Sequence, residues 1–191
     1  LILSHYDGDH VGGLQGLLRN ISVQKIILPK EKVTEASLPM YEACKQSKAI
    51  TFVAKEGMNF TLDGTELEIL GAGDYEAKGN EASTVARVSY KGRSILFTGD
   101  MDAKREEEFA RNPRADVLKV AHHGSKSSST QGFISRVSPK LAIISVGRYN
   151  MYGHPHKNVL ANLRDQGCKI FRTDEGGCIR IDFEDGKINV N

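Results

Sequence analysis

Four side chains that can bind a metal ion lie within six residues near the start of the chain: His5, Asp7, Asp9 and His10. The pattern around them predicts a strand that ends in a sharp loop and enters a helix, and such a loop can turn alternate side chains toward one point. Imidazole and carboxylate ligands together suit a divalent cation used for hydrolysis. The alternative is a polar loop whose aspartates cap the helix, but one cap does not explain two histidines at this spacing.

The six histidines of the chain occur in three pairs: His5/His10, His122/His123 and His154/His156. Each pair follows an expected strand, and so does Asp100. The ends of strands at one edge of a sheet are where α/β proteins build their sites, so we expect one composite site. For Asp100 the alternative role is the N-cap of the helix that follows.

The second and third histidine pairs leave more than one role open. Side chains alternate along a strand, so His122 and His123 would point in opposite directions if the strand before them continues. We expect His122 to bind the metal and His123 either to support the ligands from outside or to carry a proton. Two alternatives stay open: the two histidines exchange these roles, or His123 has a purely structural role. His154 and His156 precede a helix, where phosphate can be held, so they would contact substrate or protonate a leaving oxygen, or else only form the turn into the helix.

A polar loop, residues 125–130, follows the second histidine pair. Its hydroxyl groups and its one cation, beginning with Ser125 and Lys126, are suited to gripping a phosphodiester. The alternative is a flexible loop that caps the next helix, and the sequence alone favours it.

The apolar patterns predict the elements that would position these side chains. Helices at 11–20 and 34–47 alternate with strands at 25–28 and 49–53, which indicates a layered α/β fold. Two hairpins follow, 58–62 with 65–70 and 83–90 with 93–98. Helices at 103–111, 131–137 and 157–166 then alternate with strands at 116–121 and 140–146. We expect a last hairpin of 168–173 with 177–183, a strand at 187–190, and one domain over residues 1–191.

Composition limits the classes of function. Hydrophobic residues make up 39% and charged residues 26% of the 191 residues, which is typical of a soluble domain, and no apolar run is long enough to cross a bilayer. A formal net charge of +2 gives no global attraction for a polyanion, so contact with nucleic acid would depend on local groups. The three cysteines lack the spacing of a disulfide framework or a zinc finger and leave the compartment unassigned. The chain opens inside an expected strand without a methionine, so we expect an excerpt from a longer protein.

These motifs together resemble a known family. The patterns His-x-Asp-x-Asp-His at 5–10, Phe-Thr-Gly-Asp at 97–100 and His-His-Gly-Ser at 122–125 resemble the metal-binding motifs of the metallo-β-lactamase fold. Asp7, the Asn80-x-x-Ser83 segment, the runs at 118–125 and 152–156, and the closing Arg-Thr-Asp at 172–174 are similar to the hydrolase domain of bacterial DNA-uptake (competence) proteins of the ComEC type. The resemblance implies a four-layer αββα sandwich. That fold normally begins with a strand hairpin, which we expect to lie outside this excerpt.

By this resemblance, two divalent metal ions can share a cleft at the sheet edge. The first ion would be bound by His5 and Asp7, the second by Asp9, His10 and His122, and both by a bridging Asp100. Asn80 lies where the family commonly has a histidine, and an amide oxygen is a poor ligand for zinc but acceptable to harder cations. We therefore expect a weaker first site, with zinc or manganese as the ions in preference to magnesium. Asn80 is also a candidate substrate contact, together with Ser125, Lys126 and His156.

The resemblance implies a metal-dependent hydrolase, a phosphodiesterase or nuclease that acts on DNA during uptake. Asp9 or Asp100 would orient a metal-activated water, and His123, His154 or His156 would protonate the leaving group. DNA would be the partner, and the parent protein would be embedded in a membrane. Two alternatives stay open: a hydrolase of another ester, such as a phosphocholine ester, lactam or thioester, and a non-catalytic DNA-binding module.

Overall fold

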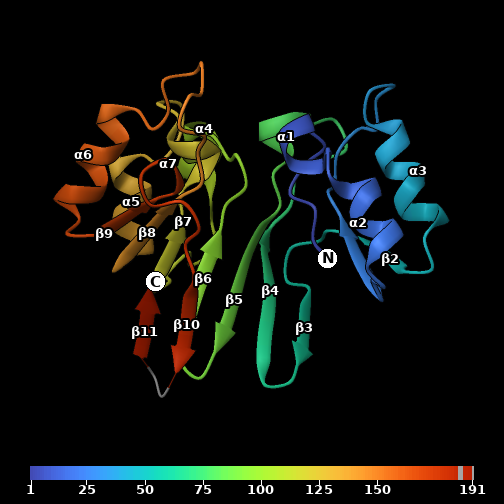
Figure 1. Ribbon diagram of the computed structural model, residues 1–191, viewed down its shortest axis with the longest axis horizontal. Helices are drawn as coiled ribbons and strands as arrows, with labels where there is room; N and C mark the ends of the chain where they lie inside the picture. Colours follow the sequence, from blue (N-terminus) through green and yellow to red (C-terminus); the bar gives the residue numbers. More distant parts are fainter. Residues whose placement is uncertain (185–186, 191) are drawn as a thin grey trace.

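A mixed seven-stranded sheet forms the larger part of the computed structural model, which describes residues 1–184 and 187–190 (Figure 1). Its strands, in spatial order, are β3 (Asn59–Leu62), β4 (Thr65–Gly71), β5 (Val85–Tyr90), β6 (Arg93–Phe97), β7 (Val117–Lys119), β8 (Leu141–Ile144) and β9 (Lys169–Arg172). Neighbours from β3 to β6 are antiparallel, and those from β6 to β9 are parallel. The carboxyl ends of the four parallel strands therefore meet at one edge, where the segments after β6, β7 and β8 carry the expected site residues.

Turn chemistry fixes the two hairpins of this sheet. Asp63 and Gly64 connect β3 to β4 with φ of 48° and 76°, and Lys91 and Gly92 connect β5 to β6 with φ of 48° and 74°. Two successive left-handed residues give the turn whose twist matches the flanking strands, and a glycine at the second position adopts it without strain. The register Leu62↔Thr65 follows, and both predicted hairpins are confirmed.

A second, smaller sheet lies on the other side of the molecule. It consists of the parallel strands β1 (Lys25–Leu28) and β2 (Ile50–Val53), and Ile2 joins it only through an isolated bridge to Ile27. Helices α1 (Gly8–Val11), α2 (Leu14–Asn20) and α3 (Leu38–Gln46) belong to this half, while α4 (Ala103–Glu108), α5 (Gln131–Val137) and α6 (Lys157–Asp165) cover the large sheet. Figure 1 shows α5 and α6 on one outer side and α2 and α3 on the other, with the strands between them.

Three clusters of buried apolar side chains separate these layers. The largest packs the large sheet against α4, α5 and α6, with Leu96, Leu118 and Ile134 almost inaccessible. A second lies between the small sheet and its helices, and a third around Ile27 and Ile69 joins the two sheets. Full burial of each such side chain contributes roughly 1.5–3 kcal/mol. The order helix, sheet, sheet, helix is the predicted αββα sandwich, which is confirmed.

The predicted hairpin of 168–173 with 177–183 is wrong. Strand β9 pairs in parallel with β8, with Leu141 opposite Lys169, because α6 between them makes a crossover and a crossover returns the chain in the same direction. Thr173–Gly176 then forms the short helix α7, and β10 (Ile181–Glu184) pairs with β11 (Lys187–Val190). None of the helices in the described residues is both long and apolar enough to span a bilayer.

The boundaries of other elements also differ from the prediction. The helix expected at 34–47 begins at Leu38, since Pro39 favours the first turn of a helix. The strand expected at 116–121 ends at Lys119, and a 3₁₀ turn, Ala121–Gly124, follows it. This early end of β7 decides how the second histidine pair is presented.

Candidate metal centre

The loop of residues 5–10 turns its two histidines toward the edge of the large sheet. Asp7 occupies the N-cap position of α1, but its carboxylate makes no capping hydrogen bond, so capping does not account for it. His5 is fully buried and His10 is partly buried, and their ring centroids are 4.2 Å apart. Ser4 Oγ lies 3.1 Å from Nδ1 of each ring. Both rings therefore turn Nδ1 toward one hydroxyl and Nε2 toward Asp100.

Asp100 lies at the centre of the site, shortly after β6. Gly99 makes the approach possible: its φ is 54°, and a Cβ there would lie 2.9 Å from Ser83 Oγ. The same Ser83 hydroxyl accepts a hydrogen bond from the backbone N–H of Asp100 at 2.9 Å. Helix α4 is capped by Asp102, whose side chain accepts from the N–H of Arg105, so the alternative role of Asp100 as the N-cap is wrong.

Four histidine rings present Nε2 to the carboxylate of Asp100. His10 Nε2 lies 3.2 Å from Oδ1, while His122 and His123 each lie 3.8 Å, and His5 4.0 Å, from Oδ2. Burial alone would raise the pKa of Asp100, but the contact with His10 and the charges of His10, His123 and His5 lower it to about 2. Asp100 is therefore an anion between two groups of imidazoles.

The two histidines of the first loop differ in how readily they hold a proton. Burial and the neighbouring His10 lower the pKa of His5. Burial acts on His10 too, but its contact with Asp100 and the charge of Asp9 outweigh it and raise the pKa of His10. The ring of His5 is thus neutral near neutral pH, whereas a cation bound at His10 would have to replace a proton.

Both histidines of the second pair face the site, because the backbone there is left-handed. His122 has φ 47° and ψ 45°, and His123 has φ 53° and ψ 20°, so the alternation of a continuing strand does not apply. The Nδ1–H of His123 donates to the carbonyl of Ser145 at 2.8 Å, which leaves Nε2 of the neutral ring as an acceptor. That Nε2 lies 3.1 Å from Asp9 Oδ2, another acceptor. Two acceptors at this distance need a proton or a cation between them.

The donor set fits a divalent metal ion. One nitrogen or oxygen from each of Asp9, His10, Asp100 and His123 lies within 4.8 Å of the others. His5 Nε2, His10 Nε2 and Asp100 Oδ1 are buried, and none of them makes a hydrogen bond of acceptable geometry, although His10 Nε2 and Asp100 Oδ1 lie 3.2 Å apart. Burial of such atoms without a hydrogen bond is costly. Imidazole nitrogens and carboxylate oxygens are common ligands of zinc and manganese. These unpartnered atoms point to a cation as the missing partner.

Asn80 reaches this centre from the turn Gly79–Ala82. Its side-chain nitrogen lies 3.4 Å from Nδ1 of His122, so it is near the second histidine pair. The turn is held against the first loop by Glu31, whose carboxylate accepts from the backbone N–H groups of Tyr6 at 3.0 Å and Gly79 at 3.5 Å. Burial raises the pKa of Glu31 against the opposing effect of these two hydrogen bonds. Glu31 was not singled out by the sequence, because nothing local marks it.

The loop of residues 125–130 is held firmly by the structure around it. Both oxygens of the buried Glu106 accept backbone N–H groups, from Ser129 at 2.5 Å and Thr130 at 2.8 Å. Thr130 caps α5, as the alternative interpretation expected. Ser125 is buried with its hydroxyl 3.0 Å from that of Ser127. Lys126 and Ser127 are exposed, so these two of the loop's candidate contacts face solvent.

The third histidine pair is tied to the second. The backbone N–H of His156 donates to the carbonyl of Gly124 at 2.9 Å, and the N–H of Lys126 donates to His156 Nδ1 at 3.2 Å. The ring of His154 lies 5.6 Å from that of His122 and 5.0 Å from that of His156. Burial, together with these neighbouring imidazoles, lowers the pKa of His154. The structure therefore brings all three histidine pairs to one edge of the sheet.

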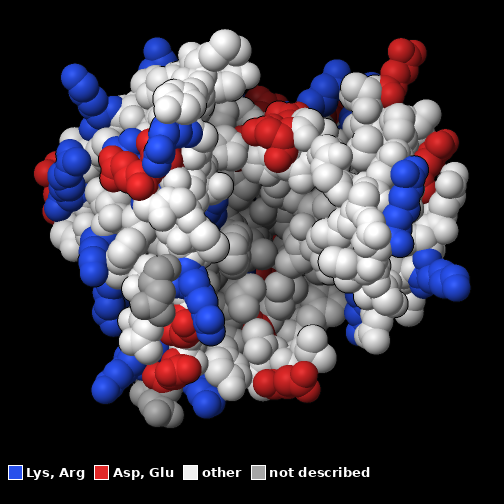
Figure 2. Space-filling view, in the orientation of Figure 1, with Lys and Arg blue, Asp and Glu red and all other residues white. Residues whose placement is uncertain are grey.

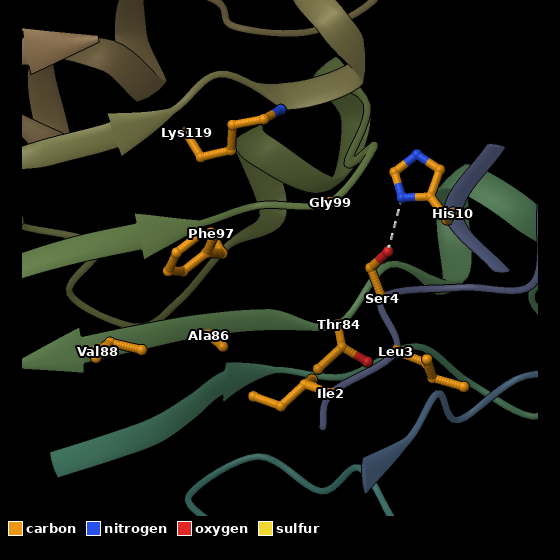
Figure 3. Close-up of a pocket in the computed structure, with 10 residues that line it drawn as sticks. All are labelled: Ile2, Leu3, Ser4, His10, Thr84, Ala86, Val88, Phe97, Gly99 and Lys119. Atoms are coloured by element: carbon orange, nitrogen blue, oxygen red, sulfur yellow. Dashed lines mark hydrogen bonds between the residues drawn. The ribbon is translucent and has the colours of Figure 1, made fainter. Parts of the chain in front are cut away.

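A hollow beside the centre contains a lysine that sequence reasoning missed. Figure 2 shows this hollow between the two halves of the molecule, with acidic side chains on the rim above α1. A cavity of about 420 Å³ there is lined by apolar groups such as Ile2 and Phe97, and by His10 and Lys119 (Figure 3). Burial lowers the pKa of Lys119, against the attraction of Asp100. The signal available in the sequence was a lysine inside an otherwise apolar strand.

Comparisons with known proteins identify the family of the chain. The family model described as the metallo-beta-lactamase superfamily matches residues 1–148. ComE operon protein 3 of Bacillus subtilis is 35% identical over 190 residues, which cover 96% of this chain and 24% of that protein. Competence protein ComA of Neisseria gonorrhoeae is 33% identical over 195 residues, which cover 100% of this chain and 26% of that protein. Recombination protein 2 of Haemophilus influenzae is 32% identical over 192 residues, which cover 100% of this chain and 23% of that protein. The chain spans about a quarter of the length of these relatives.

Solved structures show the same fold at low identity. The metallo-beta-lactamase fold protein YhfI from Bacillus subtilis has a TM-score of 0.54 and 14% identity, over 90% of this chain and 72% of that one. CmlA, a diiron beta-hydroxylase from Streptomyces venezuelae, has a TM-score of 0.58 and 13% identity, over 90% and 43%. These similarities concern the fold alone.

Proposed function

We propose that this chain, which belongs to the metallo-beta-lactamase superfamily, is a metal-dependent hydrolase of phosphodiesters and that its substrate is DNA. The observation that carries the proposal is the group of buried, unpartnered ligand atoms on His5, His10 and Asp100. DNA as the substrate is supported by whole-chain similarity to Competence protein ComA and to Recombination protein 2. Exposed Lys126 beside the third histidine pair adds a local contact for phosphate.

We assign the tighter ion site to Asp9, His10, Asp100 and His123. Support comes from their ligand atoms, which lie within 4.8 Å of one another, and from the hydrogen bond that fixes Nε2 of His123 as the free nitrogen. Metal-binding histidines commonly donate their other N–H to a carbonyl or carboxylate in this way. His123 thus takes the place for which the sequence favoured His122.

The ion that the sequence assigns to His5 and Asp7 would be held by a second group of side chains around Asp100. His5 Nε2 is 3.5 Å from Asp7 Oδ2, and both His5 and His122 approach Asp100 Oδ2, at 4.0 and 3.8 Å. We propose His5, Asp7 and His122 as its ligands, with Asn80 beside His122. Asp7 is half exposed, which agrees with the expectation that this site is the weaker one.

Each residue around the centre has a proposed task in hydrolysis. Divalent ions held there would supply a water of lowered pKa and neutralise charge that develops on a phosphate. The exposed carboxylate of Asp9 would orient the attacking water. Because His156 Nδ1 accepts from the backbone of Lys126, its neutral ring carries the proton on Nε2, where it can bond to a leaving oxygen. His154 is a second candidate for that contact.

Hydrolysis of bis(p-nitrophenyl) phosphate and of single-stranded DNA, with added Mn²⁺, Zn²⁺ or Mg²⁺, tests the proposal. Asp100→Ala and Asp9→Ala should lower the rate by roughly a hundredfold or more, because lost charge stabilisation of several kcal/mol corresponds to that factor. Metal content, measured by mass spectrometry on the same samples, should fall with activity. Asp165→Ala, which changes an exposed aspartate at the far end of α6, is the matched control and should keep full activity.

Two outcomes would contradict the proposal. If the wild-type chain binds metal but hydrolyses lactams, thioesters or phosphocholine esters instead of phosphodiesters, the substrate class is wrong. If it hydrolyses none of these and binds DNA equally well with and without the Asp100→Ala substitution, it is a binding module and the proposed hydrolysis is wrong.

A further inference from the structure

We propose that the loop of residues 147–153 is a stacking platform for unpaired bases of single-stranded nucleic acid, which deepens the proposed function and rests on it for the class of substrate. This loop, which connects β8 to α6, carries three large side chains almost wholly in solvent: Tyr149 is 90%, Met151 95% and Tyr152 76% exposed. Large apolar groups gathered in this way commonly mark a site of interaction.

The platform is held in place by one asparagine. The side-chain nitrogen of Asn150 donates to the carbonyls of Gly147 and His154, both at 2.8 Å, and its side-chain oxygen accepts the N–H of His154 at 2.9 Å. These bonds close the loop on itself and fix its end to the third histidine pair. The exposed side chains therefore stand on ordered backbone, which lowers the entropy that a bound ligand would have to remove.

A series of aromatic rings connects the platform with the metal centre. The ring of Tyr152 stacks on His154, with centroids 5.7 Å apart and planes at 26°. His154 lies 5.6 Å from His122, and His122 Nε2 lies 3.8 Å from Asp100 Oδ2. A base stacked on Tyr152 would therefore lie beside the third histidine pair. The platform is thus placed to hold a strand next to the proposed site of hydrolysis.

The charges around the loop match a nucleic-acid strand. Arg148 belongs to the loop, and Lys126 and Lys157 lie next to His156 of the third histidine pair; all three side chains are exposed. Aromatic faces combined with cations along one path are the usual means of binding single strands without sequence preference. Paired bases in a duplex do not present their faces, so double-stranded DNA would not use the platform. A membrane surface also attracts tyrosine and lysine, but it would gain nothing from rings that lead to Asp100.

Fluorescence anisotropy with labelled oligothymidylate, and with an abasic strand of equal length, tests this inference in buffer with EDTA. The wild-type protein should bind oligothymidylate more tightly than the abasic strand. Tyr152→Ala should weaken oligothymidylate binding by roughly tenfold, the usual effect of one lost stacking contact, and leave abasic binding unchanged. Tyr152→Phe should keep the wild-type affinity for oligothymidylate. Tyr152→Leu should bind as weakly as Tyr152→Ala, because leucine lacks an aromatic face.

The control is Leu62→Ala, which removes an equally exposed side chain, 74% accessible, from strand β3. It should bind both strands as the wild type does. The inference is wrong if the wild type binds both strands equally, if Tyr152→Ala weakens both alike, or if the tyrosine is needed instead for binding to phosphatidylglycerol vesicles. Because these measurements need no metal, they are independent of bis(p-nitrophenyl) phosphate hydrolysis by the wild type, which tests the proposed function alone.

Discussion

At the scale of single residues, Ser4 contacts both histidines of the first loop and would decide which nitrogen of each ring is free to bind a metal. Its hydroxyl oxygen lies 3.1 Å from Nδ1 of both His5 and His10, and its two lone pairs can accept both N–H groups. Protons held on Nδ1 leave Nε2 free on both rings, and these are the buried atoms without a partner. Ser4→Ala should therefore weaken metal binding by about 10–100-fold, as measured by calorimetric titration with Zn²⁺ or Mn²⁺.

Ser4→Thr keeps the hydroxyl and should retain most of the affinity, whereas Ser22→Ala, at an exposed position, should change nothing. Unchanged affinity in Ser4→Ala would mean that the rings are oriented by packing and not by this hydroxyl. Thermal unfolding of the metal-free proteins checks folding separately, since a loss of structure would lower the unfolding temperature of Ser4→Ala below that of the wild type.

Residue types were predictable here, but their relative roles were not. The spacing at 5–10 and the position of Asp100 after a strand were enough to gather these residues into one expected site. The choice between His122 and His123 depended on whether β7 continues, and it ends at Lys119. Two consecutive non-glycine residues in the left-handed region are uncommon, so no sequence pattern announces them. Tyr152 entered the sequence analysis only as part of the run at 152–156, and its exposure was not predicted because an exposed tyrosine has no local signature.

At the scale of elements, Asp116 fixes the starts of three neighbouring strands. Its carboxylate accepts from Arg93 at 3.2 Å, from the N–H of Ser94 at 3.2 Å and from Lys140 at 3.1 Å, which lie on or next to β6 and β8. Burial alone would raise the pKa of Asp116, but the Lys140 and Ser94 hydrogen bonds and the charges of Lys140 and Arg93 lower it. An acid with a lowered pKa stabilises the fold above its unfolded-state pKa, and this contribution disappears as the pH falls through the folded-state pKa.

Asp116→Asn should accordingly lower the free energy of unfolding by about 1 kcal/mol at neutral pH, a modest value because Lys140 is largely exposed. The difference from wild type should disappear as the pH falls below 3.8, the ordinary pKa of this group. Urea denaturation between neutral pH and about pH 3 measures both quantities. A difference that stays constant over this range would assign the loss to packing. Asp165→Asn is the control and should follow the wild-type profile.

Helices and strands were predicted accurately where a local turn sets the pairing, and wrongly where tertiary packing sets it. Hairpins marked by Asp63-Gly64 and Lys91-Gly92 were predicted within a residue or two, because the turn itself dictates the pairing. Residues 174–177 carry similar turn residues, yet β9 pairs with β8. Pairing through a crossover depends on where α6 packs, which is a tertiary effect that no local pattern contains.

At the scale of the whole molecule, the metal centre lies where the two halves meet. His5, Asp9 and His10 come from the half with the small sheet, and Asp100 and His123 come from the large sheet. The order of motifs along the chain predicted this meeting, and the predicted sandwich and family are confirmed. The contacts of Glu31, which link the first loop to the turn Gly79–Ala82, could not be predicted, because no local pattern marks this residue as the partner of Tyr6 or Gly79.

Because ligands come from both halves, a bound ion should stabilise the molecule as a whole. A ligand at a hundredfold excess over its dissociation constant adds about 2.7 kcal/mol to the free energy of unfolding. For a chain of this size that corresponds to a rise of roughly 5–10 °C in the midpoint of thermal unfolding. We expect this rise when Mn²⁺ or Zn²⁺ is added to EDTA-treated protein, and we expect Asp100→Ala to abolish it while Asp165→Ala retains it. An equal rise in Asp100→Ala would place the stabilising ion elsewhere.

In the wild type, metal binding should slow hydrogen exchange in residues 5–10 and in residues 99–101 together. One ion would then connect the two halves, so local opening of either half would break the same bonds.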